Sequence, residues 1–95
     1  MNCATVRYAR HAFERMFERS LSPTTVEAVI AGGEIIQQYP DDQPYPSQLI
    51  LGWQGSTPVH VVVALDAKAG DCIVVTAYIP EAKRWSTDFK TRSDQ

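Results

Sequence analysis

A histidine and two arginines recur at helical spacing near the start of the chain. His11, Arg15 and Arg19 occupy positions i, i+4 and i+8, which places their side chains along one face of an α-helix. A group that titrates near neutral pH, set beside two permanent cations, is suited to chemistry at a phosphodiester. An ordinary solvated helix face has the same pattern, with its arginines paired to Glu14 and Glu18. The spacing therefore indicates a candidate site without defining a reaction.

Strand parity predicts a second group of polar side chains, in two consecutive valine-rich segments. Successive side chains of a strand point to opposite faces of a sheet. If helices cover the more apolar face, His60, Thr76 and Tyr78 share the open face, where cross-strand neighbours can cooperate. Cys72 and Val74 have the same parity as Tyr78 and are expected on that open face too. A β-bulge in either strand would change this assignment.

Capping signals divide the first third of the chain into two helices. The amphipathic stretch 9–20 is the first, with phenylalanines and Met on one side and charges on the other. Ser22 is a suitable N-cap and Pro23 is tolerated at the first helical position, so a second helix begins there. Gly32 and Gly33 end it as a pair that tolerates left-handed backbone. A link of about two residues favours a helical hairpin.

After the second glycine the periodicity changes to that of strands. The expected strands are 34–39, 48–54, 59–66 and 72–79, with a weaker candidate at 4–8 and a proline-rich loop at 40–46. This order predicts an α+β fold in which a helical hairpin, 9–32, packs on one face of a twisted antiparallel sheet of about four strands, 34–79. The tail, 80–95, is expected to form a short helix that docks Trp85 and Phe89.

Charge is distributed unevenly along the chain. Residues 1–20 carry four arginines against two glutamates, and residues 83–95 carry four cations against two aspartates, while the segment between them is acidic. If the fold brings the two ends together, they form a basic patch on an acidic body. The net charge of −2 argues against strong general binding to nucleic acid.

Length and cysteine content limit the class of protein. A chain of 95 residues, 44% of them hydrophobic, is expected to form one domain, 1–95, around one modest core. Cys3 and Cys72 lie far apart without a CxxC motif, so we interpret them as inert thiols of a reduced, cytoplasmic protein. Neither a signal-peptide pattern nor a membrane-length apolar run is present. Asp41 and Asp42 are interpreted as turn residues, and no metal or cofactor is expected.

Four segments are similar to a known family: HAFERMFER, GEIIQQYPDDQPYP, PVHVVVALD and TAYIPEAKRW. The match runs over nearly the whole chain, from Tyr8 to Arg92. The chain resembles a bacterial domain-of-unknown-function family that is allied to BrnT-like and RelE/ParE-type toxins. The resemblance implies a RelE-like fold and a small cytoplasmic protein neutralised by an antitoxin encoded alongside. Superfamily relatives include ribosome-dependent or free mRNA endonucleases, and gyrase poisons that are not nucleases. Well-studied members are strongly basic, and this chain departs from them.

The first functional hypothesis is a toxin-like, metal-independent RNA endonuclease. Such cleavage requires a base for the ribose 2′-OH, cations for the phosphorane and an acid for the 5′-oxygen. The residues assigned to catalysis are His11, His60, Arg15 and Tyr78, and those assigned to RNA or phosphate binding are Arg19, Trp85 and Arg92. For each of them the alternative is structural: a packing histidine, a surface ion pair or a buried aromatic ring. The hypothesis requires His11 and His60 to face one hollow.

Two other classes of function remain open. The chain could be a non-catalytic module of RelE-like fold whose open sheet face takes a partner segment, such as an antitoxin or another domain. It could also be a toxin that acts by binding a protein target. The partners expected across these hypotheses are RNA or the ribosome and an antitoxin protein, and no membrane.

Overall fold

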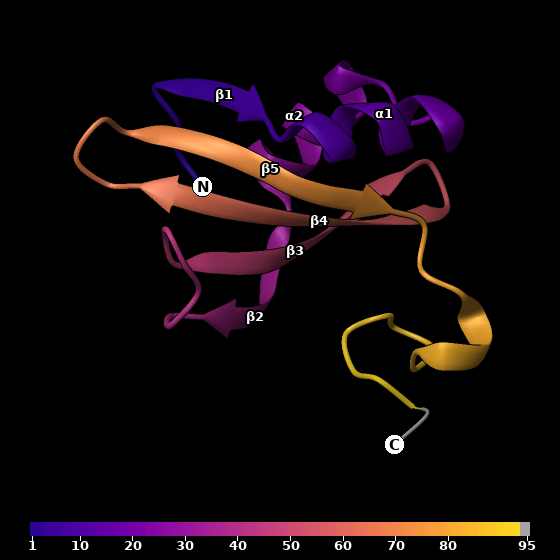
Figure 1. Cartoon of the computed structure of the whole chain (residues 1–95). Helices are drawn as coiled ribbons and strands as arrows, with labels where there is room; N and C mark the ends of the chain where they lie inside the picture. Colours follow the sequence, from indigo (N-terminus) through magenta and orange to yellow (C-terminus); the bar gives the residue numbers. More distant parts are fainter. Residues whose placement is uncertain (94–95) are drawn as a thin grey trace.

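The computed structural model describes residues 1–93, in which two helices cover one face of a five-stranded sheet (Figure 1). The elements are β1 (Thr5–Tyr8), α1 (Arg10–Glu18), α2 (Pro23–Gly32), β2 (Glu34–Tyr39), β3 (Ser47–Gln54), β4 (Thr57–Asp66), β5 (Asp71–Tyr78) and a short 3₁₀ turn, η1 (Ala82–Arg84). The predicted order of helices and strands is confirmed, with bounds that shift by a residue or two. No described helix is long and apolar enough to cross a membrane.

The sheet is mixed, in the order β1-β5-β4-β3-β2. Strands β2 to β5 form the antiparallel meander that their short links predict. β1 adds to the free edge of β5 in parallel, with Thr5 opposite Asp71 and Tyr8 opposite Val74. The expectation of about four antiparallel strands is therefore wrong in strand number and in one pairing. Short-range patterns cannot identify a partner at the other end of the chain, which is why this pairing was missed.

Each helix packs on its own strands. α1 lies over β5, and α2 lies over β3 and β4, so the predicted hairpin is held by the sheet more than by contact between the helices (Figure 1). Ala12 and Met16 form the buried stripe of α1. At the start of α2 the Ser22 side chain accepts a hydrogen bond from the Thr25 amide at 3.1 Å, which confirms the predicted cap.

The main core lies between the helices and the sheet. From the sheet it takes Ile50, Val59, Val61, Val63, Cys72, Val74 and Ala77. Cys72 and Val74 were expected on the open face and are instead fully buried here. The reason is a β-bulge: Val62 pairs with Thr76 and Val63 with Val74, so Val75 is an extra residue that reverses the parity of β5.

Cys3 and Cys72 form a disulfide, with their Cα atoms 5.6 Å apart. The interpretation of two inert thiols is therefore wrong. Parallel pairing of β1 with β5 brings the start of the chain beside β5, so two cysteines separated by 69 residues become neighbours. The cysteine-based argument for a reducing compartment fails with it, because disulfides are rare in cytosolic proteins.

The tail crosses the face of the sheet opposite the helices (Figure 1). The Trp85 ring packs edge-on against His60 at 4.4 Å between centroids, and Phe89 packs against Trp53 at 6.1 Å. Both predicted rings dock. The expected short helix is reduced to the 3₁₀ turn η1, which ends just before Trp85, and Phe89 docks from a loop. The Asp88 side chain accepts a hydrogen bond from the Lys90 amide at 3.1 Å, a local turn that competes with helix formation.

Candidate functional site

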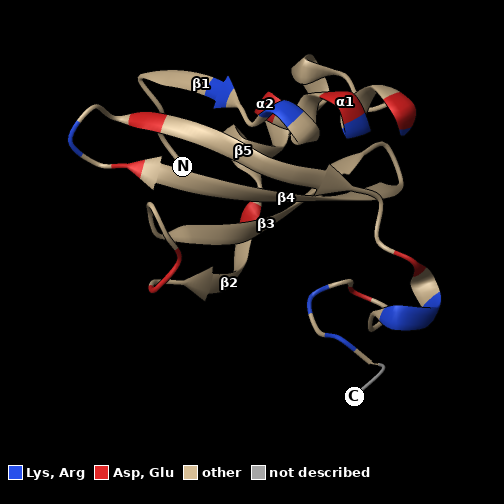
Figure 2. Cartoon of the chain, in the orientation of Figure 1, with Lys and Arg blue, Asp and Glu red and all other residues tan. Residues whose placement is uncertain are grey.

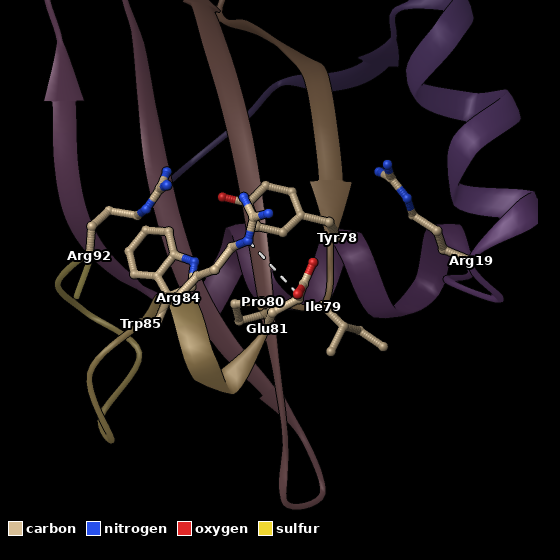
Figure 3. Close-up of a pocket in the computed structure, with 8 residues that line it drawn as sticks. All are labelled: Arg19, Tyr78, Ile79, Pro80, Glu81, Arg84, Trp85 and Arg92. Atoms are coloured by element: carbon tan, nitrogen blue, oxygen red, sulfur yellow. Dashed lines mark ion pairs between the residues drawn. The ribbon is translucent and has the colours of Figure 1, made fainter. Parts of the chain in front are cut away.

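A hollow of about 580 Å³ opens where β5 ends and the tail begins (Figure 3). It is lined by Arg19, Tyr78, Ile79, Pro80, Glu81, Arg84, Trp85 and Arg92. We call it the arginine hollow. Arg19 reaches it from the end of α1, whereas the other lining residues belong to the end of β5 and to the tail. The hollow therefore joins the two ends of the chain that the sequence marks as basic.

Three arginines face the arginine hollow (Figure 3). Arg19 donates from Nη1 to the Ala77 carbonyl at 2.8 Å, which fixes it at the edge of β5. Arg84 Nε lies 3.8 Å from Glu81 Oε2, and the Arg92 guanidinium lies over the Trp85 ring at 5.6 Å. Among the described residues that line the hollow, Glu81 is the one carboxylate.

This local excess of positive charge contrasts with the whole chain, whose net charge is −2. Figure 2 shows the lysines and arginines of the tail gathered on the sheet face opposite the helices. Glu81 and Asp88 are acidic residues of the tail, and further acidic residues lie in the β2–β3 connection and at the adjoining ends of β4 and β5. Because clustered cations raise the local concentration of anions, the hollow is suited to a phosphate or carboxylate ligand.

Tyr78 occupies the wall of the arginine hollow, half-buried. Burial raises the pKa of its phenol, and repulsion from Tyr39 adds to this, while Arg92 acts in the opposite direction. At neutral pH Tyr78 is therefore a hydroxyl that can donate a hydrogen bond. Its oxygen lies 3.3 Å from Nδ1 of His60, the residue directly opposite it on β4.

His60 lies beneath the site and has no exposed surface. Its Nε2 lies 2.8 Å from the Phe89 carbonyl, which can only accept, so Nε2 carries a hydrogen. Burial lowers the pKa of His60, against the opposing effect of the Phe89 hydrogen bond. In the neutral ring Nδ1 then accepts from the Tyr78 hydroxyl. His60 is thus placed to orient Tyr78 and to fasten the tail, and it does not reach the hollow itself.

His11 and Arg15 lie outside the arginine hollow. Both are exposed on α1, which covers the face of the sheet opposite His60. The expected convergence of His11 and His60 on one hollow is therefore wrong. The reason is that Ala12 and Met16 turn toward β5 and direct the neighbouring face of α1 to solvent. Of the predicted cationic stripe, Arg19 alone lines the hollow, from the C-cap of the helix.

Two charged residues of the site were not predicted from the sequence. Glu81 and Arg84 line the arginine hollow as an ion pair. The signal was present in the sequence, since both follow closely after Pro80, which ends the last strand, and stand next to the predicted Trp85. Predicted Tyr78, Arg19, Trp85 and Arg92 do come together at this hollow.

A second hollow, of about 490 Å³, adjoins the first. It is lined by Ile36, Gln37, Tyr39, Leu49, Tyr78, Trp85, Lys90, Thr91 and Arg92. We call it the β2 hollow. Tyr78, Trp85 and Arg92 line both hollows, so the two form neighbouring parts of one groove. Lys90 at its rim pairs with Glu34, with Nζ and Oε1 3.0 Å apart.

Within residues 1–93 no group of three or more His, Cys, Asp or Glu side chains has a metal-binding arrangement. Asp42 accepts a hydrogen bond from the Ser47 hydroxyl instead. This contact ties the proline-rich loop to the start of β3.

Neither the curated proteins nor the solved structures contain a significant relative. A protein-family model matches residues 8–79, from the last residue of β1 to the end of β5, and thus includes Arg19, His60 and Tyr78. Because this match covers well over half of the chain, the protein belongs to the family described as Domain of unknown function (DUF4258).

Proposed function

We propose that this protein is a toxin-like, metal-independent RNA endonuclease of RelE type, which binds the phosphodiester in the arginine hollow. The observation that carries the proposal is the convergence of Arg19, Arg84 and Arg92 beside the Tyr78 hydroxyl on a chain of net charge −2. Two further observations support it: the α+β architecture with both helices on one face of the sheet, and the resemblance of the sequence to RelE/ParE-type toxins. Because its substrates would be cellular RNA and ribosomes, we propose that the protein acts in the cytoplasm.

The lining residues supply the groups that RNA cleavage by the 2′-hydroxyl requires. Arginine forks hold the non-bridging oxygens and stabilise the extra charge of the phosphorane. The Glu81 carboxylate takes the 2′-OH proton as the 2′-oxygen attacks phosphorus. The bond from phosphorus to the 5′-oxygen breaks, and Tyr78 donates its proton to that oxygen. The products are a 2′,3′-cyclic phosphate and a 5′-hydroxyl, and a proton returns from Glu81 to Tyr78 through water.

His60 has a positioning role in this scheme. Its 3.3 Å contact with the Tyr78 oxygen is long for a hydrogen bond from a hydroxyl. The Tyr78 hydroxyl can therefore turn from His60 to the leaving oxygen at small cost. His11 and Arg15, which lie on the other side of the sheet, take no part in the scheme.

Induced expression tests the proposal. The wild-type protein should arrest bacterial growth and, when purified, cut RNA either alone or on ribosomes. Arg84→Ala and Tyr78→Phe should each lower cleavage by about 10²-fold, as expected for the loss of a group that stabilises the transition state. Lys68→Ala removes the same charge in the exposed β4–β5 turn, away from the hollow, and should cleave like wild type. A folded wild-type protein that causes no arrest and cuts no RNA, with or without ribosomes, would end the proposal.

A second candidate function is supported by a different surface. Phe13 and Phe17 on α1 are 53% and 85% exposed, beside an apolar hollow of about 500 Å³ at the α1–α2 turn. Large exposed apolar side chains of this kind mark contacts with a protein partner. We propose that, in a non-catalytic module, this surface binds an antitoxin-like protein. Co-expression with the product of the neighbouring gene tests it: Phe17→Asp should abolish co-purification, whereas Arg84→Ala should preserve it. Growth arrest without RNA cleavage would instead indicate a toxin that binds a protein target.

A further inference from the structure

We infer that the β2 hollow is a nucleobase site, so that the groove binds a phosphate and an adjacent unpaired base of single-stranded RNA. This inference rests on the proposed function of the arginine hollow and names the form of its substrate. To Tyr78, Trp85 and Arg92, which both hollows share, it adds side chains of β2, β3 and the second half of the tail.

The continuity of the two hollows is the first argument. Arg92 lines both of them, and its guanidinium lies over the Trp85 ring, which also lines both. A phosphate held by Arg92 would therefore have its attached nucleoside at the entrance of the β2 hollow. An anion without a base would leave this second hollow unfilled.

The lining of the β2 hollow is the second argument. Tyr39 and Trp85 provide aromatic rings, and Ile36 and Leu49 provide apolar surface. Gln37 adds an amide that both donates and accepts. An aromatic and apolar wall with a few polar groups, around a volume of about 490 Å³, is typical of a site for a small planar ligand. Stacking on aromatic rings with hydrogen bonds to the base edge is how proteins hold unpaired RNA bases.

The form of the groove favours single strands. Its walls come from the sheet on one side and from the tail, through Trp85 and Thr91, on the other. A base within a duplex is stacked and paired, so it cannot enter such a hollow without leaving its helix. A strand whose bases are already unpaired enters without that cost.

Binding to RNA with and without bases tests the inference. The probes are a short fluorescent single-stranded RNA of mixed sequence, an abasic strand of equal length, and the same RNA as a duplex, each measured by fluorescence anisotropy. Wild type should bind the base-bearing strand about tenfold more tightly than the abasic strand or the duplex. Tyr39→Ala should remove this difference while leaving affinity for the abasic strand unchanged. Tyr39→Phe, which keeps the ring, should behave as wild type.

The outcomes separate this inference from the proposed function. Equal binding of the base-bearing and abasic strands overturns the base site, even where Arg84→Ala weakens both and RNA is cut. Base-dependent binding that requires Tyr39, without any cleavage, supports the base site and overturns the nuclease. Failure of wild type to bind any of the three probes at low salt overturns the base site, and it overturns the nuclease as well where no RNA is cut on ribosomes.

Discussion

His60 shows how one buried residue can serve both the fold and the site. Its ring is fully buried between Tyr78 and Trp85, and its two nitrogens face the Tyr78 hydroxyl and the Phe89 carbonyl. It thereby joins the end of β5 to the tail. Since both hollows take part of their walls from those two segments, the shape of the groove depends on this imidazole remaining neutral and in place.

The stability of the protein should therefore depend on pH through His60. Burial lowers the pKa of His60 in the folded state below its ordinary value of about 6.5, so the unfolded chain takes up the proton first. The stabilisation that neutral His60 gives the folded state is fully present above pH 6.5. It is lost as the pH falls from there toward the pKa of His60 in the folded state. We expect the free energy of unfolding from urea titrations to fall by up to about 1.4 kcal/mol per pH unit in that window.

The matched variant for this measurement is His60→Gln, which keeps hydrogen-bonding groups but takes no proton there. It should be less stable than wild type throughout, yet lack the pH-dependent loss below about 6.5. Carboxylates that titrate at lower pH are common to both proteins and cancel in the comparison. Identical pH profiles for the two proteins would show that His60 is not the group responsible.

At the scale of elements, the two glycines at the end of α2 have different roles although they are adjacent. Both were expected to provide left-handed backbone, but Gly33 has φ of −78° and neither has positive φ. Gly33 is required instead for close approach, because an added Cβ would lie 2.5 Å from the Val29 carbonyl oxygen and 2.7 Å from that of Leu51. A Cβ on Gly32 would meet nothing within 4 Å.

Alanine at these two positions should have opposite effects on stability. Gly33→Ala should lower the free energy of unfolding by about 1–3 kcal/mol, since backbone atoms of α2 and β3 must move apart. Gly32→Ala should be neutral or raise it by up to about 1 kcal/mol, because Ala is the better helix former. Chemical denaturation of the two variants measures both. Equal effects would mean that α2 does not pack against β3 as closely as described.

The order of the elements could be predicted from local signals, and their arrangement only in part. Ser22, the proline that follows it and the change of period after Gly33 all report on neighbours in sequence, so helix and strand bounds were nearly correct. The extra residue at Val75 has no local signature, and it transferred Cys72 and Val74 from one face to the other. Parallel pairing of β1 with β5 likewise depends on contacts between distant segments.

The candidate site could likewise be predicted only in part. Arg19, Tyr78, Trp85 and Arg92 were identified by residue type and do line one hollow. Helical spacing grouped His11 with Arg19, but spacing does not say which of them lies at the edge of the sheet. The burial of His60 could not be foreseen, because it depends on how the tail folds back.

At the scale of the whole molecule, the two faces of the sheet have different roles. The face covered by α1 and α2 carries the main core, and the face crossed by the tail carries both hollows. β5 contributes to each: Cys72 near its start holds the disulfide, and Tyr78 at its end lines the groove. At about 3.3 Å per residue, these two positions lie roughly 20 Å apart along the strand.

Reduction of the disulfide should therefore weaken the fold without altering the groove. The bond closes a loop between residues 69 apart in sequence, so its loss should lower the free energy of unfolding by about 2–4 kcal/mol. The affected region is β1, which pairs only with β5 in the sheet, and its amides should exchange with solvent first. Hydrogen exchange and urea unfolding, with and without reductant, measure these effects, and Cys3→Ala should reproduce them.

RNA binding by the same Cys3→Ala variant distinguishes a structural bond from one that controls the site. Because the disulfide and the groove lie at opposite ends of β5, affinity for single-stranded RNA should match that of wild type wherever both remain folded. A protein that acts on RNA in a reducing cytoplasm must bind RNA without its disulfide, since its cysteines would be unpaired there. Loss of RNA binding at a temperature where circular dichroism shows the variant folded would mean that β1 and the groove are coupled through β5, and that the action of the protein depends on an oxidising compartment.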